Sequence, residues 1–306
     1  MTVAFAAFAN TAQAVDAAPR KSSKIALVLL APGLAYLALF FLTPLIALIL
    51  TSLQAPALYG GMGEFVYAFR WENYVEVVNE YGGTFLRSFG YALIATVAAL
   101  LISYPIAYFI GVRARKWPAV QAVALILVIA PFFISFLLRT LAWKQIFSDD
   151  SWTMETLKAL SILGPDAHFT GTSFAVIFGL TYNFIPFMTL PIYTTLERLD
   201  TRYLEASGDL YAKPSTTFFK VTLPLSMPGI VSGILLTFIP ASGDYINASG
   251  NFLGGPGTQM VGNAIQSNFL VILQYPAAAA LSIILMAVIL VIVSIYVKRS
   301  GTEDLI

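Results

Sequence analysis

The sequence predicts an all-α integral membrane protein with six transmembrane helices. Hydrophobic residues make up 58% of the 306-residue chain and charged residues only 11%, with a mean hydropathy of +0.80. Soluble domains contain about 25% charged residues, so water is not the main solvent of this chain. A second observation is that six predominantly apolar runs have about the 20 residues that a spanning helix needs. The third is an uneven distribution of lysine and arginine between the segments that join these runs.

The predicted spans cover residues 25–53, 85–112, 117–147, 173–196, 228–246 and 276–297. Residues 1–24 and 298–306 are then tails at the two ends of a single transmembrane domain, 25–297. Several spans contain proline. A spanning helix tolerates proline where neighbouring helices or water satisfy the freed carbonyls, which suits a bundle that lines a cavity.

The positive charges orient the predicted spans. Twelve of the 17 Lys and Arg residues lie on one side: Arg20, Lys21, Lys24, Arg113, Arg115, Lys116, Arg198, Arg202, Lys213, Lys220, Lys298 and Arg299. The other side holds the remaining five, Arg70, Arg87, Arg139, Lys144 and Lys158, together with nine Asp and Glu residues. Because Lys and Arg are enriched in cytoplasmic loops, the first side is predicted to be cytoplasmic and to hold both termini.

Composition also excludes several kinds of site. The chain has no cysteine and a single histidine, so disulfides, thiolate chemistry and Cys- or His-rich metal sites are excluded. The net charge of +1, without a long basic run, gives no sign of nucleic-acid binding. No nucleophile with a matching base is found, so we expect neither an enzyme nor a cofactor.

Residues 245–297 carry no charge, yet they are too numerous for one helix and contain several glycines between 250 and 257. We expect an outer loop, then a short re-entrant or interfacial helix near 260–273, then the last span. Non-helical backbone at membrane depth is viable only where it lines protein or water, so this segment favours a translocation path.

The longest charged inner segment joins spans four and five and is called the coupling segment, residues 197–227. Helical spacing and Pro214, which suits a first helical turn, predict two short cytoplasmic helices, the first within 196–211 and the second stopped by Pro224. The first helix has three small residues at its middle, Ala206, Ser207 and Gly208, which would let another protein approach closely. Glu205 and Asp209 supply anionic contacts one helical turn apart.

The coupling segment resembles a motif of known permeases. Glu205-Ala206-Ser207, followed by Ala212, Phe218, Val221, Leu223-Pro224 and Pro228-Gly229, is similar to the "EAA" loop of ABC importer permeases. The resemblance implies a type I ABC importer permease fold in the bacterial inner membrane, with the loop forming coupling helices that dock onto ATP-hydrolysing subunits. It also implies its partners: two ATP-binding subunits, a second homologous permease and an extracytoplasmic solute-binding protein.

No phosphate-binding G-x-x-x-x-G-K-[ST] sequence occurs in the chain, so ATP hydrolysis is expected on a separate chain. A secondary transporter or channel, which needs no ATPase, is the alternative. Against it, the spans lack the paired broken helices typical of inverted repeats.

The motif departs from the family at Tyr211, where relatives usually have glycine. If the turn there needs a positive φ, tyrosine costs about 1–2 kcal/mol. We therefore expect the first helix to run slightly longer and to avoid that conformation. Gly208, where relatives commonly have a larger residue, should weaken the helix by about 1 kcal/mol relative to alanine.

Three further stretches, residues 131–143, 181–193 and 239–266, resemble permeases of spermidine/putrescine importers. Related permeases for other organic cations, opines, iron or phosphonates share much of this pattern. The resemblance therefore implies a polyamine or a related small organic cation as substrate.

Six residues in or near the spans are candidates for the substrate path: Asp244, Tyr245, Tyr182, Asn183, Trp143 and Arg139. A carboxylate such as Asp244 suits a polycation, although it also fits an interfacial carboxylate or a partner of Arg139. Tyr182 and Asn183 also suit hydrogen bonds between helices. Tyr245 and Trp143 offer cation–π faces to an ammonium group, or belong to interfacial aromatic belts.

Overall fold

The computed structural model describes residues 24–57, 59 and 61–299, so the predicted tails lie almost entirely outside the described residues. The chain divides into two units, the first ending at Leu48 and the second beginning at Ile49. The N-terminal helical run consists of α1 (Lys24–Leu37), the π-turn η1 (Ala38–Leu42) and α2 (Thr43–Ser52). Its Val28–Ser52 part is long and apolar enough to cross a membrane, in agreement with the first predicted span.

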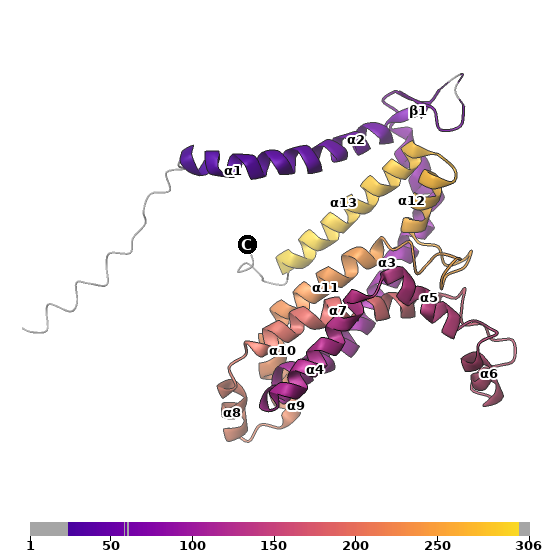
Figure 1. Ribbon diagram of the computed structural model, residues 1–306. Helices are drawn as coiled ribbons and strands as arrows, with labels where there is room; N and C mark the ends of the chain where they lie inside the picture. Colours follow the sequence, from indigo (N-terminus) through magenta and orange to yellow (C-terminus); the bar gives the residue numbers. More distant parts are fainter. Residues whose placement is uncertain (1–23, 58, 60, 300–306) are drawn as a thin grey trace, which may run out of the picture. The chain divides into compact units, whose positions relative to one another are not determined.

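The second unit is built on three helices that pack along one another, α3 (Glu72–Tyr108), α7 (Ser173–Glu197) and α11 (Met227–Ser242) (Figure 1). Small residues let these helices approach closely, as is typical of helix packing in membranes. A Cβ at Gly233 of α11 would lie 2.8 Å from Met188 Sδ and 3.1 Å from the Met188 carbonyl oxygen of α7, so glycine lets the two helices approach closely there. Around this contact, Met188, Ile192 and Ile230 join Ala99 and Ala107 of α3 in a buried core.

The helix of the second span begins at Glu72, thirteen residues before the predicted start at 85, and its helical backbone continues through η2 (Phe109–Arg113) and η3 (Ala114–Lys116). The predicted start was wrong because residues 72–84 are too polar to be predicted as part of a transmembrane helix. One face of this stretch is nevertheless buried: Val77 packs in a cluster with Val261 and Leu281, with Tyr74 and Tyr81 beside it. Tertiary packing therefore continues the helix beyond its apolar part.

The third predicted span is not one straight helix. α4 (Pro118–Ile129) passes through η4 (Ala130–Phe133) into α5 (Phe136–Ile146), and the two parts are bent by 96°. Pro131 lies in η4, and Ser135 has the extended ψ of 135°, which ends the helical backbone. Within the described residues, four helices pass the length and apolarity test for a span, and six result if each bent pair is counted as one.

The fifth span is also shorter than predicted, because α11 ends at Ser242 and Gly243 follows with a non-helical backbone. Irregular chain then leads to α12 (Val261–Leu270), which confirms a short helix near 260–273, and to α13 (Tyr275–Arg299), which runs past the predicted end at 297. The small antiparallel hairpin formed by β1 (Gln54–Pro56) and β2 (Phe65–Tyr67) was not predicted.

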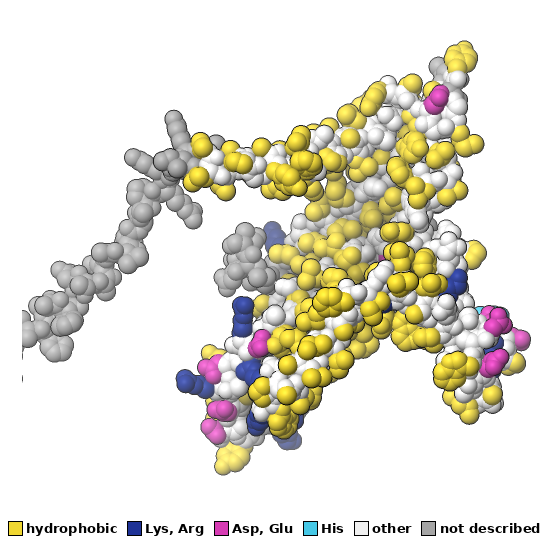
Figure 2. All heavy atoms as spheres, viewed as in Figure 1, with side chains coloured by type: hydrophobic (Ala, Val, Ile, Leu, Met, Phe, Trp, Pro, Cys, Tyr) yellow, Lys and Arg dark blue, Asp and Glu magenta, His cyan; other side chains and the backbone are white. Residues whose placement is uncertain are grey.

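Charged side chains gather at two places of the second unit in Figure 2, over the coupling segment and over α6 (Trp152–Ala159), while the helix faces between them are mostly hydrophobic. The coupling segment contains α8 (Arg202–Asp209), α9 (Pro214–Thr217), η5 (Phe218–Thr222) and α10 (Leu223–Leu225). This distribution is the one expected for a bundle whose middle meets lipid and whose two ends meet water.

Candidate functional site

The coupling segment is tied to the bundle at the end of α7. The Arg115 guanidinium, in η3, donates hydrogen bonds to four backbone carbonyls, including that of Leu199 at 3.0 Å and that of Leu196 at 2.5 Å. Three of these carbonyls, those of Leu196, Glu197 and Leu199, lie at the C-terminal end of α7 and just beyond it, where helical partners are missing. The fourth belongs to Gly111 of η2. A cation at this position both satisfies the carbonyls and fixes the start of the coupling segment.

The first coupling helix ends in a Schellman motif with Tyr211 in a left-handed conformation. The Ala212 N–H donates to the Ser207 carbonyl at 3.1 Å, the Tyr211 N–H donates to the Gly208 carbonyl at 2.9 Å, and Tyr211 has φ +56°. The expectation of a longer helix was therefore wrong. The chain keeps a turn that favours glycine and places tyrosine in it.

The residues of the EAA motif divide between two faces of α8. Ser207 is buried, and its hydroxyl lies 2.5 Å from the Thr217 hydroxyl of α9, which joins the two coupling helices. Glu205, Ala206, Gly208 and Asp209 are exposed, and Leu210 and Tyr211 beyond them are 81% and 96% exposed. The exposed face is therefore anionic along the helix and apolar at its end.

The second coupling helix does not stop at Pro224, contrary to the prediction. Helical backbone runs through η5 into α10 and ends at Leu225, and α11 follows after a bend of 65°. Pro224 lies within this continuous helical run, directly after the π-turn η5, and does not end it.

Contacts with α3 fix this bend between the coupling segment and the spans. The Tyr104 ring of α3 meets the Phe218 ring edge to face at 5.4 Å, and the Tyr104 and Ser226 hydroxyls lie 2.9 Å apart. The coupling segment is thus packed directly against α3.

A buried polar cluster forms where α5, α7 and the chain after α11 meet. Asn183 Nδ2 donates to Thr140 Oγ1 at 3.1 Å and to Asn247 Oδ1 at 3.2 Å. Asn247 in turn donates its backbone N–H to Asp244 Oδ2 at 2.8 Å and its side-chain N–H to Asp244 Oδ1 at 3.2 Å. Both oxygens of Asp244, which is only 7% exposed, therefore accept hydrogen bonds from the turn that follows it.

The structure separates the other predicted path residues from this cluster. Trp143 and Tyr182 pack together with ring centroids 5.1 Å apart, in an aromatic group that also holds Phe147 and Phe178. Tyr182 also lines an apolar cavity of about 540 Å³ with Pro105, Pro131 and Pro186. Tyr245 is half exposed, and its carbonyl accepts a hydrogen bond from Asn263 Nδ2 at 2.7 Å.

Asp244 and Arg139 do not form the ion pair that was one expectation from the sequence. Within the described residues Arg70 forms an ion pair with Glu76, and His168 Nδ1 lies at hydrogen-bond distance, 2.8 Å, from Asp149 Oδ2. Arg139 is buried, and its guanidinium lies over the Phe136 ring at 5.6 Å from the centroid. Asp244 is instead held by backbone and amide donors.

Three members of the polar cluster escaped sequence reasoning: Thr140, Asn247 and Gly179. A Cβ at Gly179 of α7 would lie 2.5 Å from Asn247 Oδ1, so this glycine makes room for the Asn247 side chain. Of these three, Asn247 could have been predicted from the sequence. Asp and Asn three residues apart, as at 244 and 247, are typical of a turn in which the carboxylate accepts hydrogen bonds from the amides that follow it.

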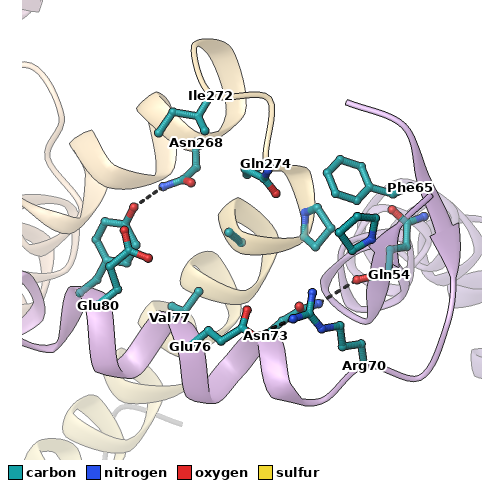
Figure 3. Close-up of a pocket in the computed structure, with 14 residues that line it drawn as sticks. Gln54, Phe65, Arg70, Asn73, Glu76, Val77, Glu80, Asn268, Ile272 and Gln274 are labelled. Carbon is teal, nitrogen blue, oxygen red and sulfur yellow. Dashed lines mark hydrogen bonds and ion pairs between the residues drawn. The ribbon is translucent and has the colours of Figure 1, made fainter. Parts of the chain in front are cut away.

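A second polar region lies at the predicted outer end of α3, around a cavity of about 230 Å³ (Figure 3). Asn73 Nδ2 donates to the Gln54 carbonyl at 2.9 Å, Arg70 pairs with Glu76 at 2.6 Å, and Asn268 Nδ2 donates to Tyr81 Oη at 3.0 Å. These contacts hold the hairpin and α12 against α3. Nowhere in the described part of the chain do three His, Asp or Glu side chains gather as metal ligands would.

A family model, described as the inner membrane component of binding-protein-dependent transport systems, matches residues 105–300 and so includes the coupling segment and the polar cluster. The chain belongs to this family. It is therefore a multi-pass permease of the bacterial inner membrane, which decides against the secondary transporter or channel.

Relatives of the permease match over most of its length. The spermidine/putrescine transport system permease protein PotB of Salmonella typhimurium is 34% identical over 283 residues, which are 92% of this chain and 96% of that protein. PotB of Escherichia coli is 36% identical over 76% of this chain and 83% of its own. The inner membrane ABC transporter permease protein YdcU of Escherichia coli is 31% identical over 72% of each.

Solved structures confirm the fold class of the permease. A chain of a bacterial ABC transporter involved in the import of the acidic polysaccharide alginate superposes with a TM-score of 0.62 at 17% identity, covering 92% of this chain and 97% of that one. A chain of the MetNI methionine ABC transporter in an inward-facing conformation superposes with a TM-score of 0.50 at 18% identity, covering 71% and 91%. At such identities the likeness concerns the fold alone.

Proposed function

We propose that the permease forms half of the translocation path for polyamines such as spermidine and putrescine, or for a related small organic cation, in an ABC importer. The observation that carries the substrate class is the 34% identity to a spermidine/putrescine permease over 92% of the chain. The other half of the path comes from a second homologous permease, and an extracytoplasmic solute-binding protein delivers the solute.

The aromatic group around Trp143 is consistent with this substrate class. Trp143, Tyr182 and Phe178 present several ring faces within one short stretch of α5 and α7, and ring faces attract ammonium groups. Asp244 is linked through Asn247 to Asn183, the residue after Tyr182, and both of its oxygens are already hydrogen-bonded. We assign the aromatic group to solute contact and Asp244 with Asn183 to positioning of the α11 end.

ATP hydrolysis takes place on two separate subunits, and the coupling segment transmits their movement. The exposed face of α8, with Glu205, Ala206, Gly208 and Asp209, docks on one ATP-binding subunit. Closure of the ATP-binding pair displaces α8, and the contacts of Ser207 with Thr217 and of Tyr104 with Ser226 carry the displacement to α3 and α11. The spans then open the path alternately to the two sides.

Replacing Glu205 with lysine tests the coupling role. Because Glu205 is exposed, Glu205→Lys should leave insertion and folding intact while it repels the docking surface, and ATP-driven putrescine uptake should fall at least tenfold. Uptake into cells and the ATPase activity of the reconstituted complex are the measurements. Glu155→Lys, an equally drastic change at an exposed site on α6, is the matched control and should transport normally. Normal uptake by Glu205→Lys would contradict the coupling role.

The substrate class is tested separately through the solute-binding protein that delivers to this permease. Its purified form should bind spermidine or putrescine more tightly than neutral or anionic solutes, as isothermal titration calorimetry would measure. A binding protein that prefers an anion would overturn the polyamine proposal and leave the coupling role untouched.

A further inference from the structure

A cavity of about 660 Å³ lies where the end of the second span meets the coupling segment. One part of its lining comes from residues 108–117, between the end of α3 and the start of α4, and the other part from the start of α8. A Cβ at Gly111 would lie 3.1 Å from Leu196 Cβ, so glycine lets η2 pack closely on α7. The cavity therefore joins the membrane-spanning bundle to the first coupling helix.

Two cations that line this cavity have no partner in the part of the chain that the structure describes. Arg113 and Lys116 are both exposed, and neither side chain has a hydrogen bond or an ion pair among the described residues. Arg115, between them, instead donates to the backbone carbonyls at the end of α7. Glu205 is the one carboxylate among the residues that line the cavity, so the positive charges outnumber the negative one. An anion therefore complements this cavity.

The apolar cavity of about 540 Å³ adjoins this basic cavity, because Phe109 lines both. The apolar cavity lies among α3, η2, α4, η4 and α7, and apart from Tyr182 every side chain that lines it is hydrocarbon. A single ligand that fills both cavities therefore needs an anionic group at one end and a hydrocarbon chain at the other.

The position of the two cavities suits a membrane lipid. The basic cavity lies on the side that the distribution of Lys and Arg predicts to be cytoplasmic, and Trp117 in its lining is 58% exposed, as is typical of tryptophan at a membrane–water interface. Basic pockets between transmembrane helices on this side bind the headgroups of anionic lipids. An ATP-binding subunit can approach the cations from water, but a soluble protein does not enter an apolar cavity among the predicted spans.

We propose that the two cavities together bind one anionic phospholipid with the chemistry of phosphatidylglycerol. Its phosphodiester lies between Arg113 and Lys116, where the guanidinium can donate two parallel hydrogen bonds, and one acyl chain occupies the apolar cavity beyond Phe109. The headgroup hydroxyls are donors for Glu205 of α8, so the same lipid contacts the spans and the coupling segment. The proposal goes beyond the transport function and does not depend on which solute is carried.

The test uses the complete importer, purified in mild detergent, freed of native lipid and titrated with phosphatidylglycerol, while native mass spectrometry counts the lipids bound to each complex. Arg113→Gln combined with Lys116→Gln should lower the occupancy of one bound phosphatidylglycerol at least tenfold, because both cations are lost. Arg198→Gln combined with Lys298→Gln is the matched control, which removes the same charge from exposed side chains outside both cavities and should bind lipid normally. An equal loss in both double variants would overturn the proposal.

Ala124→Phe tests the hydrocarbon part of the ligand, and it gives an independent result if the charge variant does not reach the membrane. Ala124 lines the apolar cavity, so a phenyl ring there should exclude the acyl chain and lower phosphatidylglycerol occupancy at least tenfold with both cations in place. Ala122→Phe, on the same helix but outside both cavities, is the matched control and should bind lipid normally. Normal occupancy in Ala124→Phe would contradict a lipid, because a free phosphate needs only the cations.

Two further measurements separate an anionic lipid from other occupants. Phosphatidylcholine, whose headgroup has no net charge, should reach at least tenfold lower occupancy than phosphatidylglycerol, and equal occupancy would overturn the assignment. Recovery of the ATP-binding subunits and of the second permease, captured through a tag on this chain, should stay within about threefold of the unmodified importer in both cavity variants. A tenfold loss of either subunit with unchanged lipid binding would mean that a protein fills the cavity, and the proposal would then be wrong.

Discussion

At Tyr211 this chain has tyrosine where relatives usually have glycine, yet its backbone adopts the turn that favours glycine. Its φ of +56° places a residue with a Cβ in a conformation that costs about 1–2 kcal/mol. The side chain is 96% exposed, so packing against the described residues does not offset this cost. The hydrogen bonds of the Schellman motif hold the backbone there. The strain is therefore local and accessible to mutation.

Tyr211→Gly should raise the free energy of unfolding by about 1 kcal/mol, because glycine adopts this conformation without steric cost. Thermal unfolding of the purified importer, followed by fluorescence, is the measurement. Ser161→Gly is the control, since Ser161 is also exposed, has φ 55° and should respond with the same sign. A lower unfolding temperature for Tyr211→Gly would mean that the tyrosine ring stabilises the turn by a contact absent from the single chain.

At the scale of elements, α5, α7 and α11 show how packing depends on single small residues. Gly179 of α7 faces the Asn247 side chain, and Gly233 of α11 faces Met188. The bend between α4 and α5 then turns Thr140 toward Asn183, so three separate segments contribute to one polar cluster. A one-methyl change at such a contact should have a large effect, because the neighbours cannot move independently.

Gly179→Ala should lower the free energy of unfolding by about 1–3 kcal/mol, since the added Cβ would lie 2.5 Å from both Asn247 Oδ1 and Leu253 Cδ1. Gly90→Ala on α3 is the matched control, because nothing lies within 4 Å of the added Cβ and alanine is the better helix former by about 1 kcal/mol. Thermal unfolding of the two variants should move in opposite directions. A destabilised Gly90→Ala variant would instead point to a partner helix at that face of α3.

At the scale of the whole molecule, the charge distribution predicts the orientation in the membrane. The coupling segment belongs to the Lys- and Arg-rich side and α6 to the acidic side, and the two lie at separate ends of the second unit (Figure 2). Counts of Lys and Arg in short loops set topology because such loops are retained in the cytoplasm. This distribution predicts that both termini are cytoplasmic.

Single cysteines test this orientation directly, because the natural chain has none. A membrane-impermeant maleimide added to intact spheroplasts should label Asp150→Cys, which is exposed before α6, and should leave Ser215→Cys in α9 unlabelled until the membrane is opened. Labelling of Ser215→Cys from outside would reverse the proposed topology and place the coupling segment away from the ATP-binding subunits.

Local features of the sequence were enough to predict the fold class, the fourth span and the two short helices of the coupling segment. Residues 173–196 are apolar throughout and form α7, and the EAA motif with Pro214 marks two short helices that the structure contains. Composition and short-range spacing determine these elements because a bilayer forces each apolar run to satisfy its own backbone hydrogen bonds. The candidate site was identified only in part, through Asp244, Asn183 and the motif residues.

Three features could not be predicted from local sequence, and only the tertiary structure decided them. Residues 72–84 are helical because Val77 packs on α12 and α13, Asp244 is satisfied by Asn247 and not by Arg139, and Tyr211 is left-handed because two backbone hydrogen bonds close its turn. None of these outcomes follows from the residue type alone. The sequence by itself determined that the chain spans a membrane, and it predicted which segment should meet the ATP-binding subunits. Packing decided which polar groups pair inside and left Arg139 without an ion pair among the described residues, because pairing depends on distances that no local pattern encodes.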